Sequence, residues 1–233
     1  MKKLHYFILI LCVIHLSCNP TEPEPTPPQL PDKSIMLINF PTNAPSQVND
    51  VVEELTTDII YCFQMFDSAK GENPIGKHPN WTWRTHYETT HENFEVTIIA
   101  KVVSENSISW EIILDGTHFG TSYDNFLFLE GTTQPDGKSG SLDVYSFYDN
   151  EILIELGWTK NKQGVLSLSD DNPSPSYLKR FDLIGHPDGS GSLTVTKKDI
   201  KIFEASWDAT GAGSWVTYDA TTGQQTDSGS WSA

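Results

Sequence analysis

The stretch that decides the fold runs FEVTIIAKV over residues 94–102 and ISWEIIL over residues 108–114. Apolar and polar side chains alternate in both segments, which is the period of a β-strand with one face on a core and the other in water. The chain alternates in this way from Trp81 onward, with turn residues at intervals typical of an antiparallel meander. The sequence therefore predicts a mainly β protein.

The connectors between the alternating segments resemble hairpin turns. They are Asp115-Gly116, Asp136-Gly137, Asp149-Asn150, Asp188-Gly189 and Thr222-Gly223. A loose repeat opens the returning segments: Gly140-Ser141-Leu142, Gly164-Val165-Leu166, Gly191-Ser192-Leu193, Gly213-Ser214-Trp215 and Gly229-Ser230-Trp231. A single hairpin cannot bury its own face, so we expect consecutive hairpins to pair edge to edge and share one core.

About a dozen strands are too many for a flat sheet, so we expect an up-and-down meander that curls into a closed or half-open barrel. One helix precedes it and is free to pack on or in the barrel. The alternative is a two-sheet β-sandwich. In architecture alone the barrel resembles the lipid-carrier group of bacterial envelope proteins, in which a curved antiparallel sheet wraps helices.

The helix is predicted over residues 48–67, where apolar side chains recur at helical spacing and Asp50 and Glu53 are placed to cap its start. Before it, residues 35–40 are predicted to form a short strand that ends in a proline-containing turn.

The N-terminus has the pattern of a secretory signal. Lys2 and Lys3 precede an apolar stretch that is too short to span a bilayer. The stretch ends in His15-Leu16-Ser17-Cys18, which resembles the lipobox of bacterial lipoproteins, with His15 where Leu is usual. This resemblance implies cleavage after residue 17 and lipidation of Cys18; ordinary secretory cleavage without a lipid is the alternative.

A proline-rich segment follows Cys18 and favours extended geometry, which suits a spacer between a membrane and a globular domain. We therefore predict a signal peptide over residues 1–17, a lipidated linker over 18–33 and a single domain over 34–233. By lipoprotein sorting rules, Asn19 implies the outer membrane; the periplasmic face and the cell surface both stay open.

Composition excludes some partners. The chain has a net charge of −16, and Arg84 and Arg180 are its two arginines. Nucleic acid, which requires a basic patch, is not expected, and membrane attachment should come from the acyl chains. With Cys12 removed and Cys18 lipidated, Cys62 has no disulfide partner and is expected to be a buried thiol.

No motif for catalysis, a metal or a cofactor emerges. Gly189-Ser190-Gly191-Ser192-Leu193 lacks the closing glycine of a serine hydrolase elbow and is interpreted as a hairpin turn. His86 and His91 have neither strand nor helical spacing for a shared metal, unless a turn brings them together. We therefore predict no catalytic residue, no metal and no cofactor.

The tryptophans are the strongest candidates for ligand binding. If they converge inside a barrel, Trp81, Trp83, Trp110, Trp158, Trp207 and Trp215 would line a cavity for an apolar ligand. If they face outward, Trp215, Tyr218 and Trp231 would form a stacking platform for sugars. Ordinary core packing is the third possibility. Phe119 and Tyr123 would either shape the rim of a cavity or close a hairpin.

These observations leave several functions open. The first is a non-catalytic envelope lipoprotein that binds a lipid or another apolar small molecule in its barrel. The second is a glycan-binding or adhesive surface module, and a structural role in the envelope fits the same facts. An enzyme would require a histidine–acid pair or two acids to converge in space, and the sequence has no local cluster of that kind.

Overall fold

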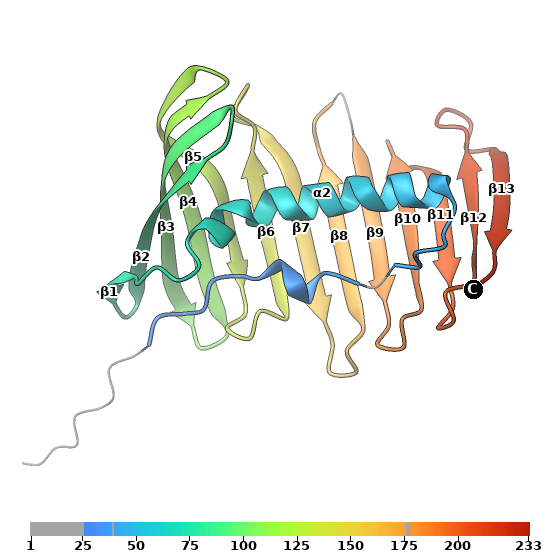
Figure 1. Ribbon diagram of the computed structural model, residues 1–233, viewed down its shortest axis with the longest axis horizontal. Helices are drawn as coiled ribbons and strands as arrows, with labels where there is room; N and C mark the ends of the chain where they lie inside the picture. Colours follow the sequence, from blue (N-terminus) through green and yellow to red (C-terminus); the bar gives the residue numbers. More distant parts are fainter. Residues whose placement is uncertain (1–25, 39, 176–177) are drawn as a thin grey trace, which may run out of the picture.

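The computed structural model describes residues 26–38, 40–175 and 178–233 (Figure 1). Its helices are η1, a single 3₁₀ turn at Lys33–Ile35, and α2 at Ser46–Ser68. Its strands are β1 Ile75–Lys77, β2 Asn80–Glu88, β3 Glu92–Ser104, β4 Ser107–His118, β5 Thr121–Thr133, β6 Ser139–Tyr145, β7 Ile152–Lys160, β8 Leu166–Asn172, β9 Lys179–Gly185, β10 Gly191–Lys197, β11 Ile200–Trp207, β12 Gly213–Tyr218 and β13 Gln225–Trp231.

All thirteen strands form one antiparallel sheet, in which each strand pairs with its neighbours in sequence. Within the described residues, β1 and β13 end the sheet and do not pair with each other, so hydrogen bonds do not close it. Register shifts in five strand pairs help the sheet to twist and curl. The predicted meander with one packed helix is confirmed, as a half-open rather than closed arrangement, and the sandwich alternative is wrong.

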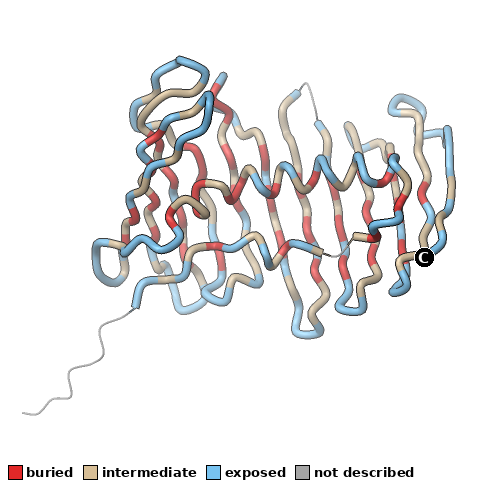
Figure 2. Tube along the Cα trace, viewed as in Figure 1, coloured by how far each residue is buried: buried red, intermediate tan, exposed pale blue. Residues whose placement is uncertain are grey.

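The core lies between the inner face of the sheet and α2, which crosses the strands (Figure 1). Buried residues follow the inner face and one side of the helix (Figure 2). Phe66 of α2 meets Trp110 of β4 edge to face, with ring centroids 5.6 Å apart, and Phe63 meets Trp158 of β7 at 6.0 Å. The helix therefore fills the space that the curled sheet would otherwise enclose.

Packing of tryptophan side chains explains part of the loose glycine repeat, at the strand ends next to the β5–β6, β9–β10 and β11–β12 turns. Three tryptophans lie over glycines on the preceding strand, so a Cβ on Gly140, Gly191 or Gly213 would lie 2.5, 2.5 or 2.3 Å from an indole carbon. The three indole N–H groups also donate to turn carbonyls: Trp158 to Gly137 (2.9 Å), Trp207 to Gly189 (2.9 Å) and Trp231 to Gly211 (2.6 Å). Each glycine leaves the room that the next strand's indole occupies.

Three local predictions are wrong. Residues 35–38 and 40 form no strand; instead they pass along the lower strand ends, where Ile38 covers Gly185. The helix begins at Ser46 after Pro45, so no acidic residue lies in its first turn and neither Asp50 nor Glu53 caps it. Asp115-Gly116 lies inside β4 beside a register shift, and the turn follows His118.

Two further features concern Cys62 and the membrane. Cys62 is completely buried, and burial raises the pKa of its thiol well above the ordinary value, as an inert core cysteine requires. No helix in the described part of the chain is long and apolar enough to cross a bilayer. Cys18 and the predicted signal peptide lie outside the described residues.

Candidate functional site

The six tryptophans proposed to bind a ligand all point to the inner face. Trp81, Trp83, Trp110, Trp158, Trp207 and Trp215 each belong to the buried core, with at most 7% of the residue exposed. Trp83 packs against Trp110 at 6.1 Å, and Trp207 packs against Phe40 at 5.2 Å. Their rings contact protein in this structure, so the core-packing interpretation accounts for where they lie, and ligand binding by them stays a prediction.

The proposed stacking platform does not form. Trp215 points to the inner face, whereas the Tyr218 hydroxyl donates to Glu204 on the outer face, beside Lys201. The two rings are therefore on opposite sides of the sheet. The signal was present in the sequence: the two residues are three positions apart on one strand, and side chains at an odd spacing point to opposite faces.

The two histidines of the 86–91 segment also lie apart. His86 on β2 contacts Glu95 of β3 at 3.1 Å, while His91 lies in the turn between these strands and stacks on Phe119 at 4.6 Å. In the described ranges, no three His, Cys, Asp or Glu side chains are grouped so that they could hold a metal ion. Ser190 is a turn residue, as predicted, and its amide and hydroxyl both donate to Asp188 (3.0 and 2.7 Å).

The structure does bring a histidine–acid pair together at the upper ends of the strands. Glu92 begins β3 and His118 ends β4, and the two residues are direct cross-strand partners. Nδ1 of His118 lies 3.1 Å from Oε1 of Glu92, and only 13% and 14% of the two side chains are exposed. Twenty-six residues separate them in sequence, so only strand register could have revealed the pair.

Aromatic rings surround this pair. His118 stacks on Phe147 with centroids 4.2 Å apart, and Phe147 also stacks on Phe94 and Phe126. Tyr123 fixes the loop that carries Phe147, because its hydroxyl donates to the Phe147 carbonyl at 2.8 Å. Tyr123 thus belongs to this aromatic cluster and does not line the hollow described next, and the ring of His118 is packed against the same cluster.

Next to the pair, an open surface hollow of about 420 Å³ lies between the β2–β3 and β4–β5 turns, and we call it the tip hollow. Its polar lining comes from Glu88, Thr89, Thr90, Glu92, Asn93 and Thr117. The stacked rings of His91 and Phe119 form its aromatic wall. These turns stand above α2 at the end of the sheet that carries β2 to β5 (Figure 1).

The tip hollow is built on constrained backbone. Phe119 is 64% exposed and has a φ of 46°, a region that bulky residues rarely adopt. Its amide donates to the His91 carbonyl at 2.8 Å, which ties the two turns together. The turn geometry explains this backbone: Phe119 and Gly120 are the two loop residues between β4 and β5, and both have positive φ (46° and 81°), as a type I′ hairpin turn requires. Nearby Tyr148 is 88% exposed and meets His118 edge to face at 6.4 Å.

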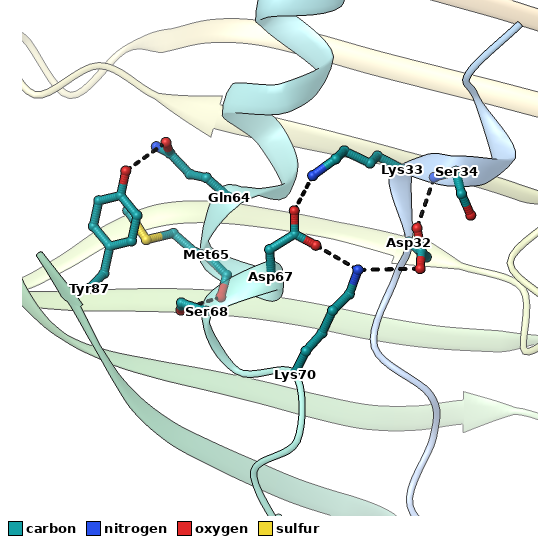
Figure 3. A network of polar contacts seen from close by, with 9 residues as sticks. All are labelled: Asp32, Lys33, Ser34, Gln64, Met65, Asp67, Ser68, Lys70 and Tyr87. Atoms are coloured by element: carbon teal, nitrogen blue, oxygen red, sulfur yellow. Dashed lines mark hydrogen bonds and ion pairs between the residues drawn. The ribbon is translucent and has the colours of Figure 1, made fainter. Parts of the chain in front are cut away.

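A polar network fixes the helix under this region (Figure 3). The hydroxyl of Tyr87 on β2 donates to Gln64 of α2 at 3.1 Å. Burial, and then the charge of Glu92, raise the pKa of Tyr87, so this donor stays protonated. At the end of the helix, Asp67 pairs with Lys33 and Lys70. Burial alone would raise the pKa of Asp67, but these two hydrogen bonds lower it below its ordinary value.

The outer face of the sheet carries a different arrangement, which we call the acidic ladder. Five acids on consecutive strands lie directly opposite one another, and Arg180 ends the row: Glu111, Glu130, Asp143, Glu155 and Asp171. Lower on this face lies an open hollow of about 660 Å³, lined mostly by Ser, Thr and Gly with Arg180 and Asp182. Its lining offers no exposed aromatic ring, unlike the tip hollow.

Comparison with known proteins gives no relative: no family model, no curated protein and no solved structure matches the chain.

Proposed function

We propose that this chain is a non-catalytic, lipid-anchored protein of the bacterial outer membrane that binds a glycan in the tip hollow. The observation that carries the proposal is the pairing of a polar ring of side chains with the exposed Phe119–His91 wall. Sugars present hydroxyl groups at their edges and apolar C–H faces, so they need hydrogen-bonding groups beside an aromatic surface. Few precisely placed polar groups then determine specificity.

The negative charge of the site indicates which class of glycan it would bind. Glu88 and Glu92 lie in the lining, and the whole chain carries a net charge of −16. Like charges repel, so neutral or amino sugars fit better than acidic polysaccharides. An apolar ligand on the inner face, the other candidate from the sequence, would require α2 to leave the surface that it covers.

The anchor rests on the lipobox-like residues and the proline spacer. A spacer of this composition would hold the tip hollow away from the membrane, where a polymer could reach it. Labelling with a radioactive fatty acid tests this part: the wild type should incorporate label and Cys18→Ser should not. Equal labelling of the two proteins would mean that Cys18 is not the lipidated residue.

A glycan array tests the binding site. The processed chain carrying Cys18→Ser is applied to arrays of neutral, amino and acidic oligosaccharides, together with Phe119→Ala in the same background. We expect binding to neutral or amino sugars and its loss in Phe119→Ala. Ile75→Ala is the matched control, because Ile75 is 71% exposed on the distant β1. Binding that survives Phe119→Ala would place the site elsewhere.

A further inference from the structure

Two carboxyl groups meet between α2 and the sheet, away from the tip hollow. Asp170 points inward from β8 and is only 1% exposed. Asp58, half-buried on α2, faces it closely enough for the two carboxyl groups to share a hydrogen bond when one of them is protonated. A hydrogen bond between two carboxyls requires a proton on one of them, since two carboxylates have only acceptors.

No cation compensates Asp170 directly. Within the described residues, its Oδ2 atom is buried and has no hydrogen-bond partner. Lys179 of β9 is the nearby base, but its ammonium group pairs with Glu54 of α2. The remaining titratable neighbours are Asp171 on β8 and the buried Cys62 thiol on α2, and neither supplies positive charge.

We propose that Asp58 and Asp170 form a proton-dependent latch that holds α2 against the sheet. With one proton between them, the pair is a hydrogen bond across the interface of helix and sheet. When that proton leaves, two negative charges face each other in a buried place, and Glu54 and Asp171 add to the repulsion. The helix then loosens from β8.

The direction of the titration follows from the surroundings. Burial, and then the charge of Asp58, raise the pKa of Asp170 to about 8. Burial also raises the pKa of Asp58. In the unfolded chain an aspartate has a pKa of about 3.9. The folded state therefore keeps a proton that the unfolded state has lost, and stability falls as pH rises from about 4 to about 8.

The test compares the processed chain with Asp170→Asn, whose amide can donate to Asp58 at every pH. Urea unfolding is measured at half-unit steps from pH 5 to pH 9. The acidic ladder also titrates, so the difference between the two proteins is the relevant quantity. We expect the unfolding constant of the wild type to rise, relative to that of Asp170→Asn, by up to about tenfold per pH unit until pH 8.

Hydrogen exchange supplies the second readout. After correction for the intrinsic pH dependence, exchange of amides in residues 54–62 should accelerate with pH in the wild type and not in Asp170→Asn. Asp50→Asn is the matched control on the same helix, because Asp50 is exposed, and it should behave as the wild type. If Asp170→Asn does not fold, Asp58→Asn tests the same pair from its less buried side.

Two results would overturn the latch. Parallel stability profiles for the wild type and the Asn variant, with no pH-dependent exchange in α2, would mean that no proton is shared. Stabilisation of the wild type alone by millimolar Ca²⁺ would mean that a metal ion, rather than a proton, joins the two carboxyls.

Discussion

The two faces of the central strands differ more than any two elements of the fold. On the inner face, Trp110, Leu142 and Leu156 are at most 1% exposed and pack beneath α2. On the outer face, one residue away in sequence, the same strands carry the acidic ladder. Burial of a large apolar side chain contributes about 1.5–3 kcal/mol, whereas like charges on opposite strands cost roughly 0.2–1 kcal/mol. Burial on the inner face therefore contributes more to folding stability than repulsion between the acids on the outer face removes.

The largest effect is expected when an aromatic side chain is removed from the inner face. Trp110 is 1% exposed, packs on Phe66 and donates to Thr133 at 2.8 Å. Trp110→Ala should lower the free energy of unfolding by about 3–5 kcal/mol, because it leaves a cavity and an unpaired hydroxyl. Urea unfolding measures the change. The neighbouring outer-face variant Glu111→Ala should shift it by less than about 0.5 kcal/mol; similar losses in both would refute the contrast.

A smaller effect is expected at a glycine beneath a tryptophan. In Gly191→Ala the new methyl group would lie 2.5 Å from Trp207 and 2.6 Å from the Ile184 carbonyl. The crowding should cost about 1–3 kcal/mol. Thermal unfolding of Gly191→Ala beside Ser192→Ala, which changes the adjacent outer-face residue, gives the comparison. A neutral Gly191→Ala would mean that the indole has room to move.

The smallest effect should have the opposite sign. Burial, and then the charge of Glu130, raise the pKa of Asp143, so its charged form is disfavoured in the folded state. Asp143→Asn should stabilise the protein at pH 7 by roughly 0.2–1 kcal/mol, and the gain should vanish below about pH 4, where both states are protonated. Urea unfolding at pH 3 and 7 checks this, with Asp124→Asn at an exposed position of β5 as control. If Asp143→Asn instead destabilised the protein at pH 7, the Asp143 carboxylate would have to make a favourable interaction in the folded state.

Sequence periodicity was sufficient for the fold class. Alternation from Trp81 onward gave the strands, and the 3.6-residue spacing of apolar side chains gave α2 to within two residues at its start. Periodicity was less reliable for the ends of the elements and for which segments pair with each other. Residues 35–38 have the composition of a strand, but their apolar side chains cover the lower strand ends instead, and composition alone cannot distinguish these two uses.

The candidate site was less accessible to sequence reasoning. Glu92 and His118 become partners only through the register of β3 and β4, and the acidic ladder depends on the register of five strands in the same way. The sequence did single out Phe119 and Tyr123. The sequence alone did not show that the tryptophans face α2, or that the exposed ring of Phe119 lies at the tip of a hairpin. Aromatic residues flanked by polar ones occur in both places.

One measurement tests most directly whether recognition occurs at the hairpin tips and not on the inner face. A glycan selected on the array is titrated into the nitrogen-15 labelled chain, and backbone amides and indole N–H signals are followed by NMR. We expect shifts for His91, Asn93 and Gly120, with the inner indoles of Trp83, Trp110 and Trp158 unchanged. Shifts confined to those indoles would contradict it and return the site to the inner face.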